Sequence, residues 1–275
     1  MTAHPKTILA GYGLEPKKSL GQNFLFDENV LGRIVEAAEL EPADQVLEIG
    51  PGLGSLTRLL AENARRVVAV ELDGRFLPAL QNELAGLDNV QIVQGDILDQ
   101  DPAHLLPGSY KVVANVPYYI TGAILRHLLS GSHKPSSMVL TVQKEVAERL
   151  TAEPPDMSLL AVSVLYYGDV DQVMTIKAGA FWPRPDVDSA VIKISVHPQS
   201  DYNAVAVDEE AFFKIVRAGF SQKRKQLQKN LRQLGIDRKG IATALEEAGI
   251  DGRRRAETLT LDEWLALVES LKRNH

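Results

Sequence analysis

Cysteine is absent from this chain of 275 residues. Its absence excludes disulfide bonds, thiolate zinc sites and cysteine nucleophiles, and it agrees with a cytoplasmic address. No apolar stretch approaches the roughly 18 residues that span a bilayer, and the N-terminus lacks the apolar run of a signal peptide. We therefore expect a cytoplasmic protein that is not attached to a membrane and holds no metal. A monomer is the default expectation.

Acidic residues are missing from one long stretch, between Lys214 and Arg232. The net charge of −6 argues by itself against a nucleic-acid partner, because phosphate binding depends on Lys and Arg. Within this stretch, however, every charged residue is basic. We interpret it as a surface for a nucleic-acid backbone, centred on Lys223, Arg224 and Lys225, although a charge run is ordinarily just a solvated helix face. The cluster Arg253–Arg255 is a second candidate.

Short apolar runs and helical patterns alternate through the first half of the chain, and this alternation predicts a parallel sheet covered by helices on both faces. The predicted strands are Val46–Gly50, Val67–Val70, Val90–Val93, Val112–Ala114 and Met138–Val142. The predicted helices are Ser55–Asn63, Arg75–Leu84, Gly122–Leu129 and Lys144–Leu150.

The order of elements changes after Met157. A helical run, Leu159–Tyr167, precedes two strand-like stretches, Val170–Ile176 and Ser189–Val196, which we expect to form an antiparallel hairpin at the edge of the sheet. Residues 198–207 resemble a linker, and only helical patterns follow, broken near Gly235, Gly249 and Gly252. The expected domains are therefore 1–200, an α/β domain, and 201–275, a small all-helical domain.

Three glycines, Gly50, Gly52 and Gly54, stand where the first strand turns into its helix, which is where nucleotide cofactors meet the edge of such a sheet. Glycine lets the main chain approach a ligand because no Cβ intervenes. Glu71 follows at the end of the next strand, at the spacing of about 20 residues where a carboxylate accepts the ribose hydroxyls. The pattern predicts a nucleotide-type cofactor, and the loop alone does not exclude NAD.

Asp96 and Ile97 follow the third strand. A carboxylate in this position can accept a hydrogen bond from an adenine amine, and an isoleucine can pack on its ring. Taken alone, Asp96 is better interpreted as a turn or helix-capping residue.

The segment Asn115-Val116-Pro117-Tyr118 ends the fourth strand and indicates chemistry on an amine. An adenine amine is a poor nucleophile because its lone pair is delocalised. An Asn carbonyl and a main-chain carbonyl fixed by proline can accept both of its N–H bonds and stabilise the charge that develops during transfer. The Tyr118 ring can stack on the base. Hydride transfer to NAD has no use for two acceptors on an amine.

Together these residues resemble the bacterial small-subunit ribosomal RNA adenine dimethyltransferases, over nearly the whole chain. The resemblance implies a Rossmann-like class I methyltransferase sheet, mostly parallel with an antiparallel hairpin at one edge, and S-adenosyl-L-methionine as cofactor. The motifs that carry it are Lys18–Leu25 (KSLGQNFL), Glu48–Thr57 (EIGPGLGSLT), Asn115–Tyr118 (NVPY), Phe181–Val191 (FWPRPDVDSAV) and Phe220–Leu227 (FSQKRKQL).

The resemblance also implies a role for each site residue. Asn23 and Leu25 would lie over the methionine part of the cofactor, and Gly50 would contact it through the main chain. Glu71 would take its ribose and Asp96 its adenine. Asn115 and Pro117 would hold the target amine, while Tyr118 and Phe181 would sandwich the target base.

The implied reaction is dimethylation of two adjacent adenosines in the 3′-terminal hairpin of 16S rRNA, in the small subunit or its precursor. Two rivals share these features: a large-subunit rRNA methyltransferase of the antibiotic-resistance type, and an assembly factor that mainly binds. The sequence departs from the commoner motif Asn-Leu-Pro-Tyr-Asn-Ile-Ser at Val116, Tyr119 and Thr121. Tyr119 is the bulkiest change and bears on how the second methyl group is accommodated.

Overall fold

The computed structural model describes residues 4–198 and 208–273. The chain forms two compact units, each with its own hydrophobic core. One unit comprises Met1–Ala147 and Val170–Val196, and the other Glu148–Asp169 and His197–His275. We call them the sheet unit and the helical unit.

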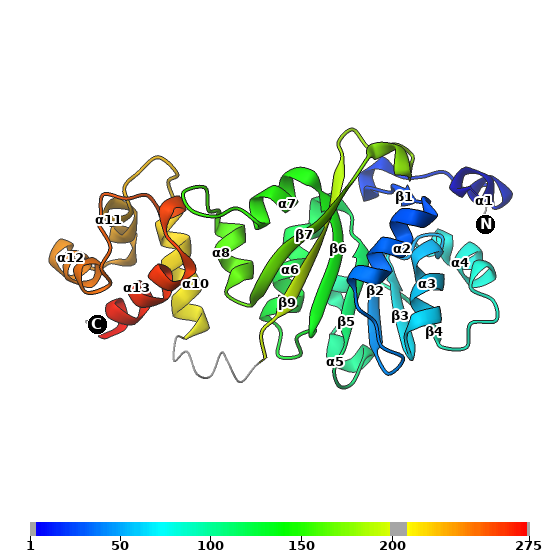
Figure 1. The fold of residues 1–275 in the computed structure, drawn as a ribbon, viewed down its shortest axis with the longest axis horizontal. Helices are drawn as coiled ribbons and strands as arrows, with labels where there is room; N and C mark the ends of the chain where they lie inside the picture. Colours follow the sequence, from blue (N-terminus) through cyan, green and yellow to red (C-terminus); the bar gives the residue numbers. More distant parts are fainter. Residues whose placement is uncertain (1–3, 199–207, 274–275) are drawn as a thin grey trace. The chain divides into compact units, whose positions relative to one another are not determined.

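The sheet unit is built on seven strands in the order β4-β3-β2-β5-β6-β9-β7 (Figure 1). Neighbouring strands from β4 to β6 run parallel, and β9 is antiparallel to β6. The strands are β2 (Gln45–Ile49), β3 (Arg66–Glu71), β4 (Val90–Gln94), β5 (Lys111–Asn115), β6 (Ser137–Gln143), β7 (Gly168–Ile176) and β9 (Ser189–Val196).

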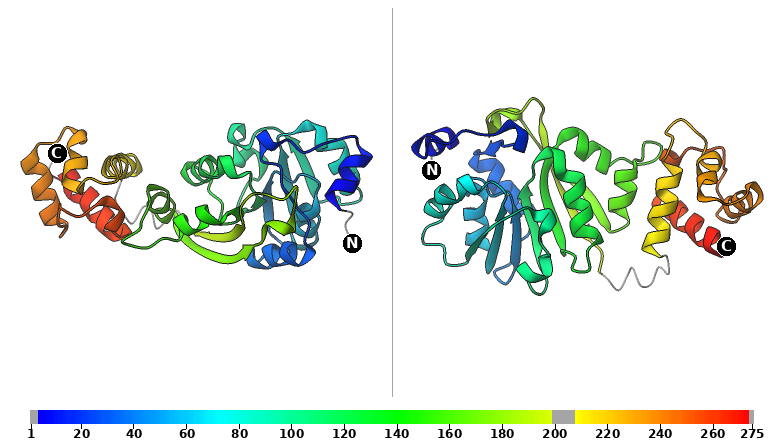
Figure 2. Two further views of the ribbon diagram at one scale, coloured as in Figure 1. Left: turned by 90° about the horizontal axis from the view of Figure 1, so that it is seen from above. Right: turned by 180° about the vertical axis from the view of Figure 1, so that it is seen from behind.

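Helices cover both faces of this sheet, so the residues of its central strands are buried on both sides and most of them are apolar. Val46, Val67 and Val113 point to one face and pack against helices α2 and α3. Leu47 and Val68 point to the other face and are equally buried; α6 lies on that side (Figure 2). The helices of the unit are α1 (Pro5–Gly11), α2 (Glu28–Ala37), α3 (Ser55–Asn63), α4 (Leu77–Glu83), α5 (Pro102–Leu105), α6 (Thr121–Ser130) and α7 (Lys144–Leu150), which continues into the helical unit.

A second, two-stranded sheet joins segments far apart in the sequence. β1 (Phe24–Leu25) pairs antiparallel with β8 (Phe181–Trp182). Short 3₁₀ turns complete the unit: η1 (Lys18–Leu20), η2 (Gly74–Phe76), η3 (Ile97–Asp99), η4 (Tyr118–Ile120) and η5 (Ala178–Ala180). The small sheet fixes the N-terminal segment against the edge of the large one, beside the carboxyl ends of its central strands.

The helical unit packs around Trp264, whose side chain is fully buried. Gly219 ends α10 directly beneath this indole, since a Cβ on Gly219 would lie 2.3 Å from the Trp264 ring. The elements are α8 (Leu159–Leu165), α10 (Glu209–Gly219), α11 (Leu227–Asn230), η6 (Leu231–Leu234), α12 (Arg238–Glu247), η7 (Ala256–Thr258) and α13 (Leu261–Arg273).

The predicted fold class is confirmed, including the parallel sheet, the antiparallel strands at its edge and the helical C-terminal part. The division between the parts differs from the expected one at residue 200, because residues 148–169 join the helical unit through Ala161 and Val162 of α8, which are buried in its core. The expected boundary itself, and the linker from residue 199 onward, lie outside the described residues. No helix among the described residues is long and apolar enough to cross a membrane.

Candidate active site

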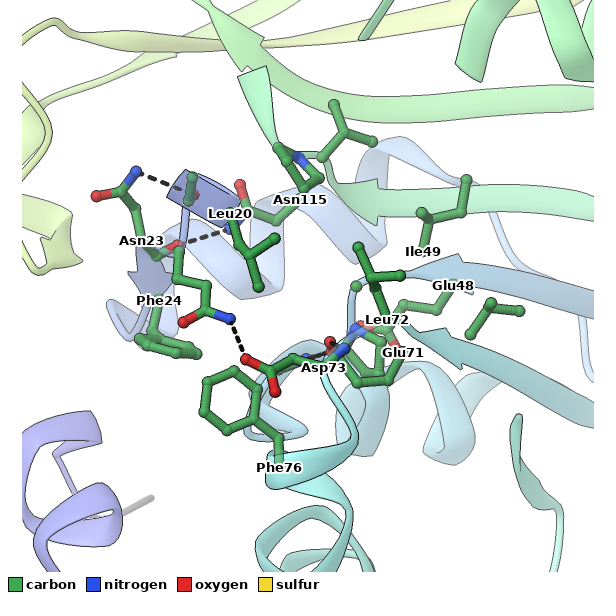
Figure 3. Close-up of a pocket in the computed structure, with 18 of the residues that line it drawn as sticks. Leu20, Asn23, Phe24, Glu48, Ile49, Glu71, Leu72, Asp73, Phe76 and Asn115 are labelled. Atoms are coloured by element: carbon green, nitrogen blue, oxygen red, sulfur yellow. Dashed lines mark hydrogen bonds between the residues drawn. The ribbon is translucent and has the colours of Figure 1, made fainter. Parts of the chain in front are cut away.

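A cavity opens at the carboxyl ends of β2, β3, β4 and β5. This is the edge at which open α/β sheets bind their ligands. Most of the residues singled out from the sequence line it: Asn23, Leu25, Gly50, Gly52, Glu71, Asp96, Ile97, Asn115, Pro117 and Tyr118. The fold therefore brings together residues that lie far apart along the chain (Figure 3).

The glycine loop between β2 and α3 forms one wall. Gly50 and Gly52 both have positive φ, 68° and 57°, a conformation that residues with a Cβ rarely adopt. A Cβ on Gly52 would also approach the Phe24 ring to 3.1 Å, whereas nothing lies within 4 Å of the corresponding point on Gly50. The loop thus presents bare main chain to the cavity, as the sequence predicts.

Glu71 ties this loop to the end of β3. Its carboxylate accepts hydrogen bonds from the main-chain N–H of Gly52, at 3.0 Å, and of Asp73, at 2.8 Å. The side chain is buried, and burial raises its pKa despite these two bonds. A carboxylate has about four acceptor positions, so it retains capacity for a ligand hydroxyl beside these main-chain donors.

Glu48 is a second buried carboxyl in the cavity wall, and the sequence analysis gave it no role. It is 1% exposed, and its Oε2 has no hydrogen-bond partner among the residues that the structure describes. Burial, reinforced by the neighbouring Glu71 carboxylate, raises the pKa of Glu48 to about 8. Its position inside an apolar strand, directly before the glycine loop, is the only sequence signal that pointed to it.

Asn115 ends β5, and its amide orientation is fixed by a segment far away in the sequence. Its Nδ2 donates to the main-chain carbonyl of Asn23 at 3.1 Å (Figure 3). Asn23 in turn donates from its own Nδ2 to the Gly21 carbonyl at 3.2 Å. With its N–H side held in this way, Asn115 has its carbonyl oxygen available as an acceptor, because no described residue donates to it.

Pro117 and Tyr118 shape the next turn. Pro117 has φ −59° and caps the 3₁₀ turn Tyr118–Ile120. The Tyr118 hydroxyl bonds to the Ser189 hydroxyl at 2.6 Å, and partial burial raises the pKa of the phenol. This bond anchors the far end of the half-buried ring, so Tyr118 is held in place at the cavity wall.

Asp96 and Ile97 lie at the end of β4. Asp96 accepts from the Leu98 N–H at 2.9 Å and therefore caps the turn Ile97–Asp99, the role that its sequence context suggested when taken alone. It also lines the cavity, beside the buried Ile97. Asp96 can serve in both ways because a carboxylate has two oxygens, and only Oδ1 accepts the bond from Leu98.

Phe181 lies elsewhere than the resemblance implied. Its side chain is 3% exposed and packs in the core with Leu25, Leu31 and Ile34, and it does not line the cavity. The reason is the pairing of β8 with β1, which sets Phe181 opposite Leu25 and directs its ring into the core. The structure therefore does not place Phe181 and Tyr118 on two sides of one base.

The basic residues expected to meet RNA belong to the helical unit. Lys223, Arg224 and Lys225 are exposed in the turn after α10, and no ion pair involves them within the described part of the chain. The second candidate cluster differs, because each of its arginines is paired: Arg253 with Asp251, Arg254 with Glu263 and Arg255 with Glu257. Its charge is largely neutralised, so this cluster is the weaker candidate.

Comparison with known proteins identifies the family. The profile of the ribosomal RNA adenine dimethylases matches residues 13–273. The chain belongs to this family.

Several members of the dimethylase family are close relatives. "Ribosomal RNA small subunit methyltransferase A" of Dehalococcoides mccartyi (strain CBDB1) is 46% identical over 97% of this chain and 92% of its own length. The protein of the same name from Moorella thermoacetica is 44% identical over 94% of each chain. The resemblance drawn from the motifs is thereby confirmed.

Solved structures agree with the dimethylase fold. A dimethyladenosine transferase from Plasmodium falciparum superposes with a TM-score of 0.79 at 25% identity, covering 91% of this chain and 98% of that one. The 23S rRNA methyltransferase ErmE superposes with a TM-score of 0.73 at 30% identity, covering 91% and 100%. The fold and the enzyme class, an rRNA adenine dimethyltransferase, follow from the family.

Replacing Glu48 tests the protonation state of the site. Since its pKa is raised from 4.5 to about 8, the folded protein retains a proton that the unfolded chain releases across that window. Stability therefore falls as the pH rises from about 4.5 to 8. We expect Glu48→Gln, which cannot ionise, to flatten this fall in urea unfolding measured at several pH values.

The matched control is Glu62→Gln, at an exposed carboxyl on α3. It should retain the wild-type dependence of unfolding free energy on pH. An unchanged slope in Glu48→Gln would show that Glu48 is ionised in the folded protein.

Proposed function

We propose that the protein transfers methyl groups from S-adenosylmethionine to N6 of two adjacent adenosines in the 3′-terminal hairpin of 16S rRNA, giving N6,N6-dimethyladenosine during small-subunit biogenesis. The single observation that carries the chemistry is the fixed amide of Asn115. The substrate is supported by the names of the relatives, which are small-subunit methyltransferases at 42–46% identity, against 30% for the 23S enzyme. A cytoplasmic location accompanies this substrate.

The cavity fits a cofactor of this class. Glu71 and Asp96 supply carboxylate acceptors at two neighbouring strand ends, one for the ribose hydroxyls and one for the adenine amine. Gly50 offers main chain with open space in front of it, and the buried carboxyl of Glu48 lies in the wall of a cavity that would take a cationic ligand. S-adenosylmethionine supplies an electrophilic methyl group on a positively charged sulfur.

Asn115 and Pro117 act on the substrate amine. The carbonyl oxygen of Asn115 and a main-chain carbonyl of the Pro117 turn accept the two N6 hydrogens, which favours a pyramidal nitrogen whose lone pair is no longer delocalised into the ring. Methyl transfer from the sulfur to N6 would leave the nitrogen positively charged until a proton is released to water, and the two acceptors would hold the nitrogen throughout. These acceptors are strongest when the nitrogen becomes positive, so they stabilise the transition state more than the bound substrate.

Tyr118 holds the base in line. Its ring lines the cavity, and the bond to Ser189 keeps it from turning away. A target adenosine has to leave its base stack before its N6 atom can come within contact distance of the Asn115 side chain. An aromatic ring that stacks on the base compensates for the lost stacking. Tyr118 would provide this contact from the cavity wall, whereas the Phe181 side chain is buried in the core.

Asn115→Ala tests the proposed chemistry. We expect at least about a hundredfold loss in the rate of methyl transfer, because one of two acceptors on N6 is removed. Affinity for S-adenosylmethionine, measured by calorimetry, should remain close to that of the wild type. Asn82→Ala, on the exposed part of α4, is the control. Transfer by Asn115→Ala at the wild-type rate would rule out this role.

The helical unit carries the proposed RNA contact. Reversing Lys223, Arg224 and Lys225 to Glu should weaken binding to unmethylated small subunits and reduce the slope of log affinity against log salt by up to about three. Arg238→Glu with Lys239→Glu, exposed on α12, is the control and should leave the slope unchanged. If the triple variant binds with the same affinity and the same slope, these residues do not contact RNA.

A further inference from the structure

Tyr119 is the most exposed aromatic side chain at the rim of the cavity. It is 58% exposed, whereas the preceding Tyr118 is half-buried and bonded to Ser189. Its hydroxyl has no hydrogen-bond partner and its ring no aromatic neighbour within the part of the chain that the structure describes. A free aromatic face beside a reaction cavity is available for stacking, because every nucleic-acid base has a π-face that can lie on it.

Tyr119 also lies against the loop that carries Gly21. It lies in the 3₁₀ turn that follows Pro117, and one side of its ring packs over Gly21. A Cβ on Gly21 would meet Tyr119 Cδ1 at 3.5 Å and Pro117 Cβ at 3.5 Å, and Gly21 has φ +62°. Gly21 therefore lies close behind the Tyr119 ring while the ring remains open to solvent, and the positive φ at residue 21 favours glycine there.

A second groove borders the cavity at the same place. The two share Gly21 and Tyr118 in their walls. Three exposed cations, Lys6, Lys18 and Arg184, line the groove, and none of them forms an ion pair with any residue that the structure describes. Its lining also contains the acidic Glu15 and Asp186. The excess of free cations suits a phosphate backbone that passes the mouth of the cavity.

We propose that Tyr119 is a stacking platform for the base next to the adenosine being methylated. This inference rests on the proposed function. A flipped adenosine in the cavity leaves its neighbour at the rim, where a free aromatic face replaces the lost stacking partner. The two target adenosines are adjacent in the RNA. While one of them is methylated in the cavity, the neighbouring base that stacks on Tyr119 can therefore be the other target adenosine. Tyr119 is therefore a positioning residue for the pair.

The test compares Tyr119→Ala, Tyr119→Leu and Tyr119→Phe in steady-state methylation of unmethylated small subunits. Stacking of a base on an aromatic ring contributes about 1–3 kcal/mol, so Tyr119→Ala should raise KM about tenfold, with kcat within about twofold. Tyr119→Phe, which retains the ring, should restore the wild-type KM. Tyr119→Leu, which is apolar but not aromatic, should not.

Two controls isolate the effect. Tyr12→Ala removes another exposed tyrosine of the sheet unit that lines neither cavity nor groove, and it should behave as wild type. Calorimetry with S-adenosylmethionine checks that the Gly21 loop is intact, since Asn23 in that loop lines the cavity. Wild-type KM in Tyr119→Ala, or equal defects in the Phe and Leu variants, would overturn the proposal. If the wild type itself methylates no small subunits, the proposed function fails instead.

Discussion

The hydrogen bond from the Asn115 amide to the Asn23 carbonyl connects the end of β5 to the segment that carries β1. An asparagine side chain at a strand end can turn either its NH₂ group or its oxygen toward a neighbour. Only the NH₂ group can donate a hydrogen bond to a carbonyl. The bond therefore decides that the oxygen, and not the nitrogen, is offered to a substrate. It depends in turn on β1 pairing with β8, which brings the N-terminal segment to the edge of the large sheet.

Two buried carboxyls give the cavity its electrostatic character. Glu71 accepts hydrogen bonds from the main-chain N–H groups of Gly52 and Asp73. The Oε2 atom of Glu48 has no hydrogen-bond partner among the described residues, and burial raises the pKa of Glu48 to about 8. Two unscreened negative charges at such a depth would repel each other, and holding one carboxyl neutral avoids this. A site of this kind is poised to accept a positively charged ligand, because ionisation of Glu48 would then be favoured.

Much of this arrangement was predictable from the sequence. Apolar runs and helical periodicity located the strands of the parallel sheet, and the glycine loop, Glu71 and Asn115 occupy the strand ends where such folds bind ligands.

β1 and β8 were not predicted, because strands of two residues show no periodicity and their partner is distant in the sequence. The role of Phe181 at the target base was implied by the resemblance alone, and the pairing of β8 with β1 directs its ring into the core. Glu48 escaped notice because a carboxyl within an apolar strand looks like part of the motif until its burial is known. Helix α8 was assigned to the wrong part of the chain, because an apolar helix does not reveal which core it joins.

In the most direct measurement, the protein is incubated with labelled S-adenosylmethionine and one RNA substrate in each of three separate reactions. The substrates are unmethylated small subunits, large subunits and free adenine-containing RNA. The proposed function predicts label in the small subunits, recovered as N6,N6-dimethyladenosine from the 3′-terminal hairpin of 16S rRNA. Label that appears only in large subunits, or in none of the three, would contradict it.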